Sequence, residues 1–276
     1  MAYTAAKLTE TNLPTIIVNK YDLNEKYPNI GSGDEGEVYS YCNQYALKTF
    51  SFFRAMEYFY GEQLKNKFAK IEAMAPLKDE SFCIPLGLFG YHDGYKEGCF
   101  TDLVLYKKGL KDFGDLKNIK NFETLLEYIL KADAAMQRGH KQDLIIGDVK
   151  ENNIMIDINN NPRYVDVDNY AYQDFGFNMP VARAQRLKEI YGHSGDLKDN
   201  DIFLFATMSL KILTDNTDFN CFKDRETLNY LIEHLNISKE TKQDLKIIFS
   251  DAQNKPYIGP ILQRIKTEQQ EIIVLK

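Results

Sequence analysis

The spacing of hydrophobic and polar residues changes about a third of the way along the chain. The first hundred residues contain short segments rich in β-branched and aromatic residues, each bounded by Gly, Asn or Asp, and such segments predict strands. They cover residues 15–18, 38–41, 45–50 and 103–106. Among them, residues 52–74 mix charged and apolar side chains at helical spacing, which predicts one helix.

The remainder of the chain has mostly helical spacing. One amphipathic helix is predicted by apolar residues three and four apart, namely Phe122, Leu125, Leu126, Ile129, Leu130 and Ala134. Strand-like residues 154–158 and 163–167 flank three asparagines and Pro162, which predict a hairpin turn. Further helices are expected at residues 202–213, 225–235, 239–249 and 258–266. We therefore expect an α+β protein with a strand-rich N-terminal lobe, residues 1–106, and a mainly helical C-terminal lobe, residues 107–276.

Length and composition narrow the class of protein. A chain of 276 residues with 44% hydrophobic and 27% charged residues is typical of a soluble globular protein. The net charge of −6 argues against a nucleic-acid binder, which needs a basic surface. The sequence contains no apolar run that could span a bilayer and no Sec signal peptide at its start. We expect a cytoplasmic monomer, although delivery as a secreted effector stays open.

A glycine-rich segment leads into the second predicted strand. Residues 30–39, IGSGDEGEVY, contain Gly31, Ser32, Gly33, Gly36 and Val38 in a GxGxxGxV pattern that could approach phosphate groups closely. When such a pattern stands alone, an ordinary turn explains it about as well as a phosphate-binding loop does. A dinucleotide-binding fold needs a helix after the last glycine, and a Walker A loop needs Gly-Lys-Ser/Thr. Here a strand follows, so we expect a strand–turn–strand flap.

Lys48 lies twelve residues beyond Gly36 in the segment YALK. Without its context it would be a surface lysine on a strand. Next to a glycine-rich flap, the segment resembles the protein-kinase strand whose lysine holds the α- and β-phosphates, and this resemblance implies a carboxylate partner on the following helix. We select Glu72 because an apolar strand, expected at residues 82–85, follows it at a suitable interval, while Glu62 and Glu57 remain alternatives.

The strongest chemical signal is the segment LIIGDVKENNIM, residues 144–155. Asp148 could accept the proton of a substrate hydroxyl, and Lys150 could offset charge on a transferring phosphoryl group. Asn153 offers an amide oxygen to a metal. Asp166, eighteen residues after Asp148, offers a carboxylate to Mg²⁺. The hairpin between them would bring these groups to one site.

The ordered set of flap, Lys48, Asp148, Lys150, Asn153 and Asp166 resembles the protein-kinase superfamily over about residues 30–263. The Gly-Asp catalytic loop and the Asp-Val-Asp segment are similar to a bacterial branch of that family. The resemblance implies a two-lobed kinase fold with ATP and Mg²⁺ as cofactors. It also implies that Leu105 lies beside the nucleotide and that Asp201 anchors the catalytic loop.

The sequence departs from the kinase pattern at three places. Ile146 and Gly147 replace His-Arg before the catalytic aspartate, so we expect activity without activation-loop phosphorylation. Asp168 replaces the glycine of Asp-Phe-Gly and could be a second metal ligand or, more simply, cap the loop. The Ala-Pro-Glu segment is missing, and Lys255 stands where its arginine partner is expected.

The resemblance favours transfer of the γ-phosphoryl group to Ser or Thr of a protein substrate, because a lysine lies two residues after the catalytic base. A small-molecule phosphotransferase and a nucleotide-binding pseudokinase scaffold are the alternatives. Arg183, Arg186 and Lys188 could meet an acidic substrate, although a solvated helix face explains them more simply. We interpret the four scattered cysteines as buried free thiols and the four histidines as surface or capping residues.

Overall fold

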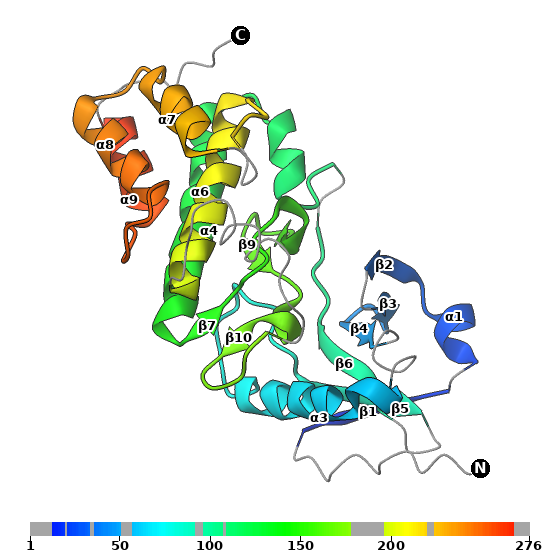
Figure 1. Ribbon diagram of the computed structural model, residues 1–276. Helices are drawn as coiled ribbons and strands as arrows, with labels where there is room; N and C mark the ends of the chain where they lie inside the picture. Colours follow the sequence, from blue (N-terminus) through cyan, green and yellow to red (C-terminus); the bar gives the residue numbers. More distant parts are fainter. Residues whose placement is uncertain are drawn as a thin grey trace. The chain divides into compact units, whose positions relative to one another are not determined.

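A computed structural model describes residues 13–19, 21–33, 36–50, 57–91, 96–106, 109–177, 196–219 and 224–267. The fold is α+β, with a six-stranded mixed sheet followed by a mainly helical region (Figure 1). The chain divides into two compact units. The first comprises Met1–Leu105 together with Asp166–Asp168, and the second comprises Tyr106–Val165 and Asn169–Lys276.

The first unit is built on the six-stranded sheet. Its strands are β1 (Thr15–Val18), β2 (Asn29–Gly33), β3 (Gly36–Tyr41), β4 (Tyr45–Thr49), β5 (Gly87–Tyr91) and β6 (Lys96–Asp102). They lie in the order β1-β5-β6-β4-β3-β2, with β1 parallel to β5 and the other pairs antiparallel. Two helices, α1 (Asp22–Lys26) and α3 (Glu57–Met74), belong to the same unit.

Three of the four predicted strands correspond to β1, β3 and β4, and the predicted helix corresponds to α3. The strand predicted at residues 103–106 is wrong, because pairing with β4 ends at Asp102, opposite Tyr45. Residues 82–85 are likewise not a strand; the next one, β5, starts at Gly87. Gly87 and Gly98 are required by close packing rather than by strand propensity, since a Cβ on Gly98 would lie 1.9 Å from the Lys48 carbonyl oxygen.

Alternation along β4 decides which side chains enter the core. Leu47 is fully buried in a cluster with Tyr39, Phe89 and Phe100. Successive side chains of a strand point to opposite faces, so Lys48 lies on the other face of the sheet. It is paired there with Val38 on β3 and with Cys99 on β6.

The second unit is mainly helical. It contains η1 (Phe113–Asn118), α4 (Phe122–Lys141), α6 (Leu197–Thr214), α7 (Arg225–Glu233), α8 (Lys239–Ile248) and α9 (Ile258–Thr267). Short elements follow α4 in sequence, namely β7 (Leu144–Ile145), η2 (Glu151–Asn153), β8 (Ile154–Ile156), β9 (Pro162–Tyr164) and β10 (Ala171–Tyr172). The single turn η3 (Val167–Asn169) also precedes α6, but its first two residues belong to the first unit. The predicted helices therefore exist. Helix α6 begins five residues before the predicted start, because the Asp196 side chain accepts from the Lys198 amide and caps it.

Helix α6 lies at the centre of this unit. Almost every residue from Asp199 to Thr214 is buried, and the Phe205 ring lies 6.4 Å from Phe113 of η1. Phe203 meets Phe249 edge to face at 5.4 Å. None of the described helices is long and apolar enough to cross a membrane.

Two expectations about cysteine and histidine need correction. Cys83 and Cys99 are buried as expected, but Cys42 is exposed in the turn between β3 and β4, where its φ is 53°. His140 is a buried residue of α4 that contacts Tyr257 and Asp201, and not a surface residue. Cys221, His92 and His193 lie outside the described residues.

Asp133 on α4 gives the second unit a titratable core group. It is buried, and burial raises its pKa to about 6, although hydrogen bonds from Gln137 and the Gly259 backbone oppose this. Because the folded protein favours the protonated carboxyl, Asp133 contributes stability below about pH 4. The free energy of unfolding falls by about 3 kcal/mol as the pH rises through 6. Urea unfolding from pH 4 to 7 should therefore show Asp133→Asn gaining on the wild type by about that amount. A difference between the two proteins that does not vary with pH would contradict this expectation.

Candidate functional site

The glycine-rich segment contributes to two paired strands, β2 and β3. Strands β2 and β3 are antiparallel, with Gly33 opposite Gly36 and Ser32 opposite Glu37, while residues 34–35 lie outside the described part. Gly36 is required by packing, because a Cβ there would lie 2.1 Å from the Thr49 carbonyl oxygen. A Cβ on Gly31 would meet no atom within 4 Å, so packing does not require this glycine.

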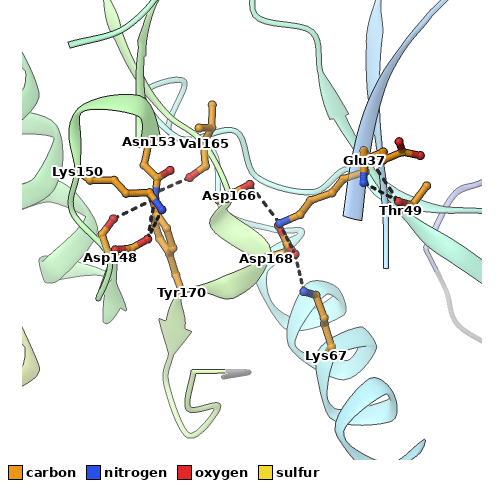
Figure 2. A network of polar contacts seen from close by, with 11 residues as sticks. Glu37, Thr49, Lys67, Asp148, Lys150, Asn153, Val165, Asp166, Asp168 and Tyr170 are labelled. Atoms are coloured by element: carbon orange, nitrogen blue, oxygen red, sulfur yellow. Dashed lines mark hydrogen bonds and ion pairs between the residues drawn. The ribbon is translucent and has the colours of Figure 1, made fainter. Parts of the chain in front are cut away.

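Within the first unit, Lys48 reaches two aspartates that follow it by more than a hundred residues. Its Nζ lies 3.1 Å from Asp166 Oδ1 and 3.0 Å from Asp168 Oδ1 (Figure 2). Asp168 also binds Lys67 of α3, with 2.7 Å between Lys67 Nζ and Asp168 Oδ2. Burial alone would raise the pKa of Asp168, but the charges of Lys48 and Lys67 outweigh it and hold the pKa below its ordinary value.

The other candidates of the first unit are three glutamates of α3 and Leu105. Glu72 is half-buried near the end of α3, and the side chains of Glu57 and Glu62 lie outside the described residues, so the choice among the three carboxylates stays open. Leu105 is an exposed residue of the irregular stretch after β6. Its proposed contact with a nucleotide remains a prediction.

The second unit holds the other group of candidates. Lys150 Nζ lies 2.6 Å from Asp148 Oδ2, and Asn153 Nδ2 donates to the Asp148 carbonyl oxygen at 3.0 Å and to Oδ2 at 3.3 Å (Figure 2). The single turn η2 brings Asn153 back to Asp148. The backbone oxygen of Asn153 accepts from the Val165 amide at 3.0 Å. This hydrogen bond joins η2 to the residue just before Asp166. Asp148, Lys150 and Asn153 thus form one hydrogen-bonded group.

Asp201 fixes the start of this segment. Its two carboxylate oxygens accept from the amides of Ile146 and Gly147, each at 2.7 Å, and Oδ2 also lies 3.0 Å from His140 Nε2. His140 Nδ1 lies 2.8 Å from the Tyr257 hydroxyl. The anchoring role expected of Asp201 is confirmed. The contact of His140 with Asp201 could not be predicted, because a lone histidine on a helix has no distinctive spacing.

Gly147 is held in a conformation that other residues avoid. Its φ is 75°, and a Cβ would lie 2.4 Å from the Phe177 ring. Gly147→Ala should lower the free energy of unfolding by about 2–3 kcal/mol, from backbone strain plus the clash. Gly109→Ala is the matched control, because φ there is 85° and the space is open. Urea unfolding should show a loss of only about 1 kcal/mol for this control, and equal losses would mean that Phe177 does not matter.

The donor atoms suit a hard cation. Asp166, with φ at 61° and its side chain 42% exposed, keeps a carboxylate oxygen beyond the one that Lys48 contacts. Asn153 uses its Nδ2 toward Asp148, which leaves its amide oxygen as the donor. In the described part of the chain no three His, Cys, Asp or Glu side chains gather to hold a metal. Each oxygen, within its own unit, is a ligand of the hard type that Mg²⁺ prefers, and Mg²⁺ usually takes one or two carboxylates while keeping several waters.

Two further features of the sequence are Lys255, which stands in place of an arginine, and the basic residues between 183 and 188. The Lys255 side chain is buried and donates to the Ser250 carbonyl oxygen, and burial lowers its pKa to about 8. Arg183, Arg186 and Lys188 lie outside the described residues. Comparison with models of protein families and with curated proteins finds no match.

Proposed function

We propose that this chain is an ATP- and Mg²⁺-dependent kinase that transfers the γ-phosphoryl group to Ser or Thr of a protein, and that its two units are the lobes of a protein-kinase-like fold. The observation that carries the proposal is the ion pair between Lys48 and Asp166, 118 residues apart in sequence. A lysine for the α- and β-phosphates and a carboxylate for the bridging metal are the pair that phosphoryl transfer requires.

The polar group of the second unit supports the same chemistry. Asp148 has a carboxylate that can orient a substrate hydroxyl and take its proton, and the Lys150 amine, 2.6 Å from that carboxylate, would offset charge on the phosphoryl oxygens. Asn153 would offer its amide oxygen to Mg²⁺. Magnesium, when bound, would neutralise charge on the β- and γ-phosphates. The protein contributes fixed positions, since loops held by Asp201 and by the Val165 amide need little rearrangement.

Incubation with γ-labelled ATP, Mg²⁺ and mixed protein acceptors tests the proposal. We expect label on protein with the wild type and none with Asp166→Ala, because this variant lacks the metal carboxylate. Asp251→Ala, which removes a carboxylate with a 72% exposed side chain, is the matched control and should label normally. ATP binding without labelled protein would favour a small-molecule acceptor. Absence of ATP binding would refute the kinase and leave a binding scaffold that acts without nucleotide.

A further inference from the structure

Lys67 is a lysine in a position that normally belongs to an apolar residue. It lies on α3 with no exposed surface, on the same helix face as the fully buried Ile71 and Met74. A lysine is almost never fully buried unless it is paired. Its amine lies 4.3 Å from the centre of the Phe50 ring and 2.7 Å from Asp168 Oδ2, so it has both a cation–π contact and an ion pair.

Asp168 connects Lys67 to Lys48. Its side chain is 4% exposed, and its two oxygens lie 3.0 and 3.2 Å from Lys48 Nζ. Lys48 in turn contacts Asp166, whose side chain is 42% exposed. The charges therefore alternate in one chain of contacts, Lys67–Asp168–Lys48–Asp166. Its inner end is sealed in the core of the first unit, and its outer end faces solvent.

We propose that Lys67 is a positioning residue for the nucleotide-binding lysine: it fixes Asp168, and Asp168 holds the Lys48 amine beside Asp166. The inference rests on the proposed function for its use, since it names the residues that orient Lys48 toward phosphates. A buried ion pair is strongly oriented, because breaking it leaves an uncompensated charge in the interior. Helix α3 thus contributes a cation to this part of the site.

An unfolding cycle tests the inner half of the chain of contacts without any ligand. The variants are Lys67→Met, Asp168→Asn and the double variant K67M/D168N, with Lys67→Arg keeping the charge. We expect the double variant to unfold at a higher urea concentration than Asp168→Asn, because the latter leaves Lys67 buried beside an amide. Lys67→Arg should unfold closer to the wild type than Lys67→Met does. Losses that simply add would overturn the inference.

A second cycle asks whether Lys67 acts through Lys48. The dissociation constant for Mg²⁺–ADP should rise about tenfold in Lys67→Met and less than twofold when the same change is made in Lys48→Met. An equal loss in both backgrounds would overturn the inference, since Lys67 would then bind the nucleotide itself or only support the fold. Failure of the wild type to bind nucleotide would instead refute the proposed function. The unfolding cycle, which needs no ligand, would still test whether Lys67 and Asp168 are coupled.

Discussion

Asp201→Ala should lower the free energy of unfolding by about 3–5 kcal/mol, the cost of stranding buried partners of a removed charge. The carboxylate is fully buried and accepts two amides at 2.7 Å each, besides its contact with His140. Since a domain of ordinary stability has only about 5–15 kcal/mol, the variant should unfold at a much lower urea concentration. The proposed phosphoryl transfer should also fall at temperatures where the variant is folded, because Ile146 and Gly147 immediately precede Asp148.

Asp199→Ala separates the two effects. Asp199 lies two residues earlier on the same helix, is buried, and accepts the amides of Asn254 at 3.0 Å and Lys255 at 2.8 Å. Its removal should destabilise the protein by a similar amount while leaving the segment before Asp148 in place. If both variants, measured while folded, lose the same share of transfer activity, the loss is a general effect of removing a buried carboxylate from α6. The positioning role of Asp201 would then be wrong.

The elements that were predictable are those fixed by local pattern. Helix α4 follows from apolar residues three and four apart, and the β8–β9 hairpin from a turn of asparagines. Strand β6 was missed because KEGCFTD has few β-branched residues; its strand exists through pairing with β4 and β5. Strand β9 stops at Tyr164, because Asp166 takes a positive φ that no strand continues.

The candidate site likewise contains residues that spacing could locate and contacts that it could not. Spacing located Lys48, Asp148, Lys150, Asn153 and Asp166, and the structure brings them together in two groups, one in each unit. Asp168 was expected to cap a loop or bind a metal, but it pairs with Lys48 and Lys67. The signal for Lys67 was present in the sequence. It lies four and seven residues before Ile71 and Met74, so a helix would place a lysine in an apolar stripe.

Asp148→Asn should reduce the rate of phosphoryl transfer by about a thousandfold, within the usual range for loss of a positioned acid–base group. The amide keeps the size of the side chain and the backbone oxygen that accepts from Asn153 Nδ2 at 3.0 Å. It cannot take a proton, and it loses the charge that faces Lys150 Nζ at 2.6 Å. Binding of Mg²⁺–ADP should change less than threefold, because in the proposed mechanism the carboxylate acts on the substrate hydroxyl and not on the nucleotide.

Asp143→Asn is the matched control for this prediction. Asp143 lies five residues earlier in the sequence, has a 67% exposed side chain and pairs with Lys198 at 3.1 Å. An exposed ion pair of this kind contributes little, so its loss should change the transfer rate less than twofold. Should Asp148→Asn retain more than a tenth of wild-type activity, proton acceptance would not be its main role. Catalysis would then depend on Lys150 and the metal, through stabilisation of charge on the phosphoryl group.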